Sequence, residues 1–220
     1  MIEDVVRVAI AIALGYLIAG VPFGVIVARR VYDVDITALG SGNTGATNVF
    51  RSLGWQPALL VAVLDVAKGA VPAAVALLLL ADPSWSDNAR DLLLIAVAGS
   101  AMAGHMYSPY FRLRGGKGVA TAAGAILVLM PMAFLALLVV FVTLVLVVRI
   151  VSVASMCTAF AFPAAIALLY PDRPVLLGFA VVAIPLIVWS HRANIRRLLR
   201  GDEPRITMGR VDRDGSKERS

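Results

Sequence analysis

The chain has 220 residues, of which 60% are hydrophobic and 15% charged, and its mean hydropathy is +0.87. A soluble domain is about half apolar and about a quarter charged, so this composition excludes an ordinary soluble protein. The formal net charge is +6. Because the basic residues flank apolar runs, anionic lipid headgroups and anionic substrates are favoured over nucleic acid as partners. Cys157 is the only cysteine, so no disulfide can form within the chain.

Seven apolar segments predict seven transmembrane helices, because a helix needs about 20 residues to cross the roughly 30 Å of bilayer hydrocarbon. The first segment is expected to be a retained span rather than a cleaved signal peptide, since the acidic residues Glu3 and Asp4 precede it and Arg29 and Arg30 follow it. The longest apolar run is divided at Pro131, because proline ends or kinks a helix. The predicted segments are 5–28, 57–81, 91–108, 118–130, 132–148, 151–170 and 174–190.

Three polar stretches separate the apolar runs, at 29–56, 109–118 and 191–205. Together with Arg149 and the charged tail at 206–220, they hold 16 of the 20 lysines and arginines. Basic residues accumulate on the cytoplasmic side of membrane proteins. The sequence therefore predicts all three stretches in the cytoplasm and the N-terminus outside, which requires an even number of crossings between the second and third stretches.

The first polar stretch contains SGNTGATNVFR at 41–51. Glycines let backbone N–H groups turn toward a ligand, while hydroxyls and amides supply donors and the closing arginine offers a bidentate fork for phosphate. A polar turn between two spans explains such a stretch about equally well. The candidate ligand-binding residues are Ser41, Gly42, Asn43, Thr47, Asn48 and Arg51.

The second stretch contains GGKGVAT at 115–121 and leads directly into an apolar helix. Free N–H groups and the positive end of a helix dipole favour phosphate at a helix N-terminus, and Lys117 adds a charge. The spacing of a Walker A loop is missing. A basic turn at the membrane interface is the alternative. The candidate residues are Gly115, Gly116, Lys117, Gly118 and Thr121.

The third stretch, at 191–205, predicts a basic amphipathic helix beside the membrane, with His191 and Asn194 near its start. Ionisable residues also occur inside the predicted spans, where they are costly and usually pair or face a polar cavity. Asp65 and Lys68 lie three residues apart on the second span, and His105 lies near the end of the third. They form either a structural ion pair or a support beneath the cytoplasmic loops.

The three stretches resemble, in order and spacing, the motifs of the PlsY-type glycerol-3-phosphate acyltransferases of bacteria, which use acyl phosphate. The resemblance covers about residues 8–205 and includes Asp65-x-x-Lys68-Gly69. It implies an all-α integral membrane protein with seven transmembrane helices, in which residues 1–205 form one acyltransferase domain of the bacterial cytoplasmic membrane. The tail at 206–220 is expected to be a disordered cytoplasmic segment. The substrates would be acyl phosphate and glycerol 3-phosphate, with no cofactor or metal.

The implied products are lysophosphatidic acid and inorganic phosphate, the first step of phospholipid synthesis. The implied catalytic residues are Ser41, Arg51, Lys117, His191 and Asn194. The substrate-binding residues would be Gly42, Asn43, Thr47, Asn48, Gly115, Gly116, Gly118 and Thr121. Structural support would come from Asp65, Lys68, His105 and Glu203. The proton of the attacking hydroxyl would go to a substrate phosphate or to His191.

Two other functions compete with acyl transfer. A transporter for phosphate or an organophosphate would explain a broken span, buried charges and helix N-termini aimed at an anion. A lipid-binding scaffold without enzymatic activity is the third possibility. The G-x-S-x-G elbow of hydrolases that form an acyl-enzyme is not present. The H-x4-D pair of the soluble-headed glycerolipid acyltransferases is also absent, because the residue five positions after His105 is Tyr110 and the residue five positions after His191 is Arg196.

Overall fold

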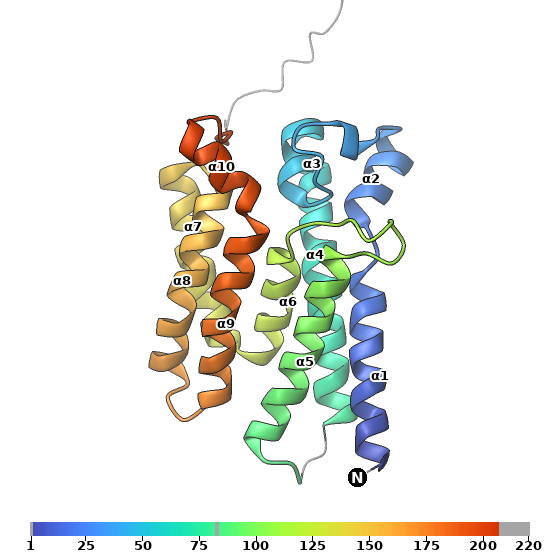
Figure 1. The fold of residues 1–220 in the computed structure, drawn as a ribbon, viewed down its shortest axis with the longest axis vertical. Helices are drawn as coiled ribbons and strands as arrows, with labels where there is room; N and C mark the ends of the chain where they lie inside the picture. The colour runs from blue at the N-terminus through green and yellow to red at the C-terminus, as the bar shows by residue number, and fades with distance from the viewer. Residues whose placement is uncertain (1, 82–83, 207–220) are drawn as a thin grey trace, which may run out of the picture.

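The computed structural model of the chain describes residues 2–81 and 84–206. Within these two ranges the regular elements are all helical, and the longer ones run side by side as a bundle (Figure 1). In chain order they are α1 (Ile2–Ala19), α2 (Phe23–Tyr32), η1 (Ile36–Ala38), α3 (Ala46–Leu53), α4 (Trp55–Val75), η2 (Ala76–Leu80), α5 (Asp87–Met106), α6 (Val119–Leu129), α7 (Pro131–Val148), α8 (Val151–Leu169), α9 (Pro174–Ser190) and α10 (Arg192–Arg200).

Prolines set several of these boundaries. Pro131 and Pro174 each occupy the first turn of a helix, where the missing N–H is not needed, and α6 ends just before Pro131 as predicted. The first apolar run differs from the prediction of one continuous helix. It breaks after Ala19, and α2 begins after Pro22, whose ring and missing N–H interrupt the helical hydrogen bonds.

Four helical segments of the described chain are long and apolar enough to cross a bilayer: Ile2–Tyr32, Trp55–Leu80, Pro131–Val148 and Val151–Leu169. The pair α9 and α10, bent by 60°, would be a fifth, and α6 is apolar but shorter. These lengths agree with an all-helical membrane protein. The count of seven spans and the outside position of the N-terminus stay predictions.

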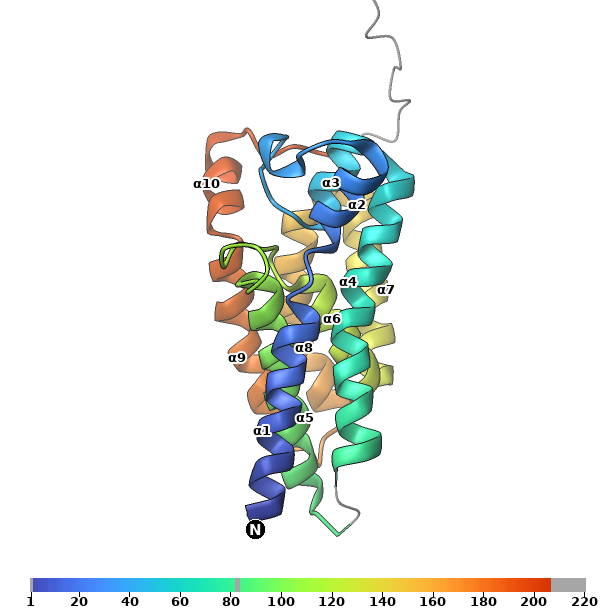
Figure 2. The ribbon, with the colours of Figure 1, turned by 90° about the vertical axis from the view of Figure 1, so that its right-hand side faces the viewer.

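The three polar stretches lie at one end of the bundle. Figures 1 and 2 show α2, α3 and α10 at this end, with the loop between α5 and α6 just beneath them. We call it the motif end. The start of α1 and the α8–α9 connection lie at the opposite end. Ile206, the last described residue, donates its backbone N–H to the carbonyl of Arg149 at 2.7 Å. The rest of the predicted tail lies outside the described residues.

Small residues let α4 and α6 approach closely. A Cβ atom on Gly69 would lie 1.9 Å from the backbone oxygen of Thr121, and one on Gly124 would lie 1.9 Å from that of Val66. Neither position could therefore carry a side chain without moving the helices apart. This contact fixes the start of α6, and the lysine-bearing loop before it, over the middle of α4.

Candidate active site

Glu203 is the centre of a buried polar cluster at the motif end, and its side chain is only 1% exposed. Its Oε1 accepts hydrogen bonds from Asn194 Nδ2 at 2.6 Å and from Ser152 Oγ at 2.9 Å. Its Oε2 accepts from Arg197 Nε at 2.7 Å, and Arg51 Nη2 lies 4.0 Å from Oε1. We call these five residues the Glu203 cluster. It joins α3, α8, α10 and the segment after α10.

Burial would by itself raise the pKa of Glu203. The hydrogen bonds from Asn194, Arg197 and Ser152 outweigh that effect and hold the pKa below its usual range. The carboxylate is therefore ionised at neutral pH, and it is already occupied by donors from the protein. This arrangement suits the support role predicted for Glu203, because an ionised carboxylate with these contacts holds its neighbours in place and has no proton to give.

Two polar atoms of the Glu203 cluster have no partner within the described chain. Arg51 Nη2 donates to the Pro204 carbonyl at 3.0 Å, but Arg51 Nε is buried and unpaired. Asn194 Oδ1 is likewise buried and unpaired, although its amide nitrogen is bound. Buried polar groups are nearly always hydrogen-bonded, so each exception needs an explanation. One free donor and one free acceptor suit a ligand that carries both an anionic oxygen and a hydroxyl.

Lys117 adds a second cation beside the cluster. It lies in the loop before α6, where Gly118, the residue before the helix begins, takes φ +78°. Burial lowers the pKa of Lys117 to about 8, helped by the positive charges of Arg197 and Arg51 and opposed by Glu203. No carboxylate of the described residues lies within 4.0 Å of its ammonium group. The electrostatic balance at this point is positive and suits an anion.

His191 lies at the bend between α9 and α10 and is 2% exposed. Its Nδ1 lies 2.8 Å from the Ile187 carbonyl and 3.1 Å from Ser190 Oγ. Donation from Nδ1 to the carbonyl leaves Nε2 with a lone pair that can accept a proton or a hydrogen bond. Burial, together with the charge of Lys117, lowers the pKa of His191 to about 4. The imidazole is therefore neutral at physiological pH.

The first motif folds around Asn48. Its Nδ2 donates to the carbonyls of Ile36 at 3.1 Å and Leu39 at 3.0 Å, and its Oδ1 accepts from Ser41 N at 2.9 Å and Oγ at 3.2 Å. Asn48 thus shapes the loop that presents Ser41. Asn43 Oδ1 accepts from Gly45 N at 2.9 Å in the turn before α3. In the described chain, none of the hydrogen bonds of Ser41 reaches the Glu203 cluster.

The second motif rests on His105 of α5. Gly116 donates its N–H to the His105 carbonyl at 3.2 Å. A Cβ atom on Gly115 would lie 1.9 Å from the same oxygen, and one on Gly116 would lie 2.0 Å from His105 Nε2. The loop can therefore approach His105 only because these positions are glycines. This contact with α5 sets the position of the next residue, Lys117.

The remaining predicted binding residues belong to these two motifs. Thr47 is half-buried in the first turn of α3, and Gly42 takes φ +69° in the loop before it. Thr121 is fully buried on α6, and its hydroxyl has no partner within the described residues. Binding by these residues, and by Asn43 and Asn48, stays a prediction. The structure does bring together Arg51, Lys117, His191 and Asn194.

The chain is similar in sequence to known proteins of one family. The sequence model of a family described as glycerol-3-phosphate acyltransferase matches residues 9–201. The chain belongs to this family. A glycerol-3-phosphate acyltransferase of Thermus thermophilus is 43% identical over 194 residues, which cover 88% of this chain and 92% of that protein. That of Desulforamulus reducens is 41% identical over 191 residues, covering 87% and 91%.

Solved structures of the family share the fold. A crystal structure of PlsY, described as an integral membrane glycerol 3-phosphate acyltransferase in its glycerol 3-phosphate form, is 34% identical, with a TM-score of 0.81 over 91% of this chain and 96% of that one. A second PlsY structure, in a lysophosphatidic acid form, gives a TM-score of 0.79 with 91% and 95% covered. This confirms that the acyltransferase is an all-helical membrane protein, and it confirms the resemblance predicted from the motifs.

Two residues of this acyltransferase's Glu203 cluster were missing from the predicted site. Arg197 lies one helical turn after Asn194, so the i,i+3 spacing could have placed it on the same face. Ser152 follows Arg149, and the basic bias already assigned that connection to the motif end. The carbonyl of Pro204, which binds Arg51, carried no sequence signal because every residue has a carbonyl.

Proposed function

We propose that this glycerol-3-phosphate acyltransferase moves a fatty acyl group from acyl phosphate to the 1-hydroxyl of sn-glycerol 3-phosphate. The hydroxyl oxygen bonds to the acyl carbon, the bond from that carbon to the phosphate oxygen breaks, and inorganic phosphate and lysophosphatidic acid form. The observation that carries the proposal is the group of unpaired polar atoms at the motif end. Arg51, Lys117 and Asn194 come there from different polar stretches and suit a phosphorylated alcohol.

The residues of the site have two roles: some hold the charged phosphates, and others orient the reacting groups. Lys117, the amides of its loop and Arg51 hold the two phosphates. Asn194 Oδ1 and His191 Nε2 accept hydrogen bonds from the glycerol hydroxyls, and Ser41 helps to orient the carbonyl. Acyl phosphate is already an activated mixed anhydride, so direct attack needs no acyl-enzyme intermediate. Catalysis then comes from positioning and from stabilising developing charge.

The low pKa of His191 favours a substrate phosphate as the acceptor of the hydroxyl proton. A phosphate monoester has a second pKa of about 6 and is mostly dianionic at neutral pH, whereas the imidazole has a pKa of about 4. We expect His191→Gln to lower kcat less than about tenfold, since glutamine can still accept a hydrogen bond. The measurement is steady-state kinetics in detergent. A loss beyond about a hundredfold would identify His191 as the general base.

The motif end is proposed to face the cytoplasm of a bacterial membrane, with seven spans and the N-terminus outside. The basic residues of the three polar stretches support this orientation. Single cysteines in a Cys157→Ser background test it with a membrane-impermeant thiol reagent. Asp202→Cys, at the motif end, should react only in inverted vesicles, and Asn88→Cys, at the opposite end, only in intact cells. The reverse pattern would contradict the orientation.

The donor is tested with purified, detergent-solubilised protein given glycerol 3-phosphate and acyl phosphate, acyl-CoA or acyl carrier protein thioester. We expect lysophosphatidic acid from acyl phosphate alone, with one phosphate released per product. A transporter would release no phosphate in detergent solution, where no second compartment exists. Synthesis with acyl-CoA but not acyl phosphate would overturn the proposed donor, and no synthesis with any donor would overturn the proposed reaction.

A further inference from the structure

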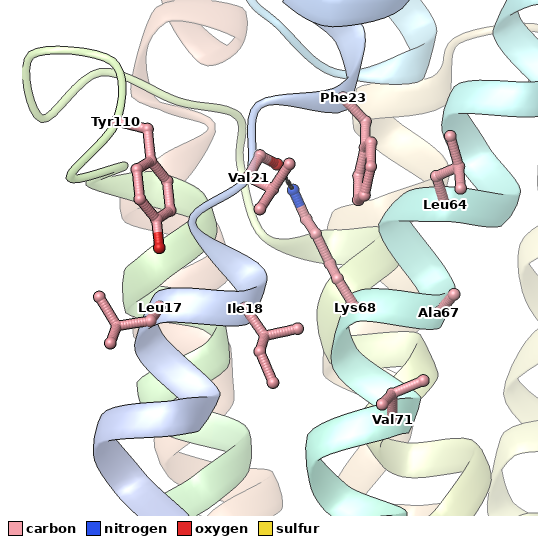
Figure 3. A pocket seen from close by; sticks show the side chains of 9 residues that line it. All are labelled: Leu17, Ile18, Val21, Phe23, Leu64, Ala67, Lys68, Val71 and Tyr110. Atoms are coloured by element: carbon pink, nitrogen blue, oxygen red, sulfur yellow. Dashed lines mark hydrogen bonds between the residues drawn. The ribbon is translucent and has the colours of Figure 1, made fainter.

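A buried ion pair on α4 reaches the break between α1 and α2. Lys68 Nζ lies 2.9 Å from Asp65 Oδ1 and donates to the Val21 carbonyl at 3.1 Å. Figure 3 shows Lys68 extending from α4 to Val21, with the Phe23 ring beside it; Nζ lies 5.7 Å from the centre of that ring. The lysine lines a groove of about 370 Å³ between α1 and α4 whose other lining residues are apolar or aromatic. Its ammonium group therefore ties the α1–α2 break to α4.

The other side of the same pair faces the second motif. Asp65 Oδ1 lies 3.7 Å from His105 Nδ1, too far for a hydrogen bond but close enough for the carboxylate charge to act on the ring. Nδ1 has no hydrogen-bond partner within the described chain. Since Gly116 packs against Nε2 of this ring, a rotation or shift of the imidazole would move Gly116 and therefore Lys117.

Two further hydrogen bonds join the same segments. Ser108 Oγ donates to the Gly20 carbonyl, and Tyr16 OH donates to the Tyr107 carbonyl at 2.8 Å. The end of α1, its break and the start of the loop that leads to Lys117 are thus one connected unit. The ion pair attaches this unit to α4.

We propose that Asp65 and Lys68 are positioning residues that set the place of Lys117 through His105 and Gly116. The inference rests on the proposed function, in which Lys117 holds a phosphate. Helix packing alone does not explain the pair, because charged groups inside a span are costly and apolar residues of similar size often stabilise a buried site as well or better. The charged groups instead fix two positions. The Lys68 ammonium group donates to the Val21 carbonyl, and the Asp65 carboxylate lies beside His105.

The test is the double variant Asp65→Asn with Lys68→Met, which removes both charges without leaving one unpaired. We expect KM for glycerol 3-phosphate to rise about tenfold while kcat stays within about twofold, as for the loss of one well-placed charge-assisted contact. Glycerol 3-phosphate is the sensitive substrate because it has no acyl chain to hold it. Lys68→Arg, which keeps the charge but moves the donors, should raise KM about threefold.

The matched control is Asp91→Asn with Arg173→Met, which neutralises an ion pair at the opposite end. It should lower Tm and leave KM unchanged. An unchanged KM in folded Asp65→Asn/Lys68→Met protein, whatever its Tm, would overturn the positioning role. If that variant does not fold, an unchanged KM in Lys68→Arg overturns it instead. Wild-type protein that makes no lysophosphatidic acid would refute the proposed function, and an unshifted KM in active variants would refute only this inference.

Discussion

The two ends of the bundle both contain buried carboxylates paired with arginine, and they are built differently. At the end opposite the motifs, Arg173 binds Asp91 with two parallel hydrogen bonds, Nε to Oδ2 at 2.9 Å and Nη2 to Oδ1 at 2.5 Å. One guanidinium group uses both carboxylate oxygens. At the motif end, Glu203 is surrounded by Arg51, Arg197 and Lys117, so positive charge exceeds negative.

The difference separates a structural ion pair from a binding site. The bidentate pair at Asp91 is complete, and it joins the start of α5 to the start of α9. The Glu203 cluster leaves Arg51 Nε and Asn194 Oδ1 without partners in the described chain. Burial of unpaired polar atoms and excess charge is costly unless another molecule completes the contacts. Incomplete hydrogen bonding, rather than the mere presence of charge, therefore indicates the functional end.

The largest effect should come from removing a cation at the motif end. Lys117→Met is expected to lower kcat/KM for glycerol 3-phosphate about a hundredfold or more, because a charge-assisted contact with a phosphate is lost in a partly buried site. Steady-state kinetics on purified protein measures this loss. Arg196→Met is the matched control, since Arg196 is exposed on α10, and it should change kcat/KM less than about twofold. Equal losses in both variants would contradict the comparison.

The pH dependence of kcat/KM tests the role of the same cation, Lys117. Lys117 has a pKa of about 8, lowered mainly by burial, so its ammonium form is present below pH 8 and is lost as the pH rises through that value. We expect kcat/KM to fall about tenfold per pH unit well above pH 8. Lys117→Arg should move this alkaline decline upward, because a guanidinium stays protonated. If the alkaline decline of kcat/KM stays at the same pH in Lys117→Arg, a group other than Lys117 causes it.

The smallest effect on activity should come from the opposite end. Asp91→Asn with Arg173→Met is expected to lower Tm by several degrees, on the order of the loss of one partly buried ion pair. It should leave kcat/KM within about twofold of wild type. Thermal unfolding followed by intrinsic fluorescence and the acyltransferase assay together check both expectations. A large loss of activity with unchanged Tm would show that this pair belongs to the catalytic machinery.

The sequence predicted the class of fold from local patterns, and it predicted that the three polar stretches gather at one end of the bundle. The apolar runs, Pro131 and the bias of basic residues located most helices and placed the polar stretches together. The glycines of the second motif were predicted to bind phosphate, and the structure adds a second reason for them, since Gly115 and Gly116 allow contact with His105. A resemblance to known motifs supplied the reaction, which composition could not.

Contacts between distant segments were the part that the sequence could not specify. The hydrogen bond of Arg51 to the Pro204 carbonyl joins positions 153 residues apart, and Ser152 meets Glu203 across 51 residues. Hydropathy could not show the break before α2 either, because the residues around Pro22 are as apolar as the helix before them. The two long-range contacts depend on tertiary packing, which has no periodic signature in the chain, whereas the break before α2 has a local signal in Pro22.

Binding of glycerol 3-phosphate to purified protein without donor tests the central claim most directly. Isothermal titration calorimetry should show one saturable site per chain, with inorganic phosphate as a competitor. In Arg51→Met the affinity should fall at least about tenfold, while Arg173→Met should bind as wild type does. Equal affinity in wild-type and Arg51→Met protein would contradict a phosphate site at the Glu203 cluster.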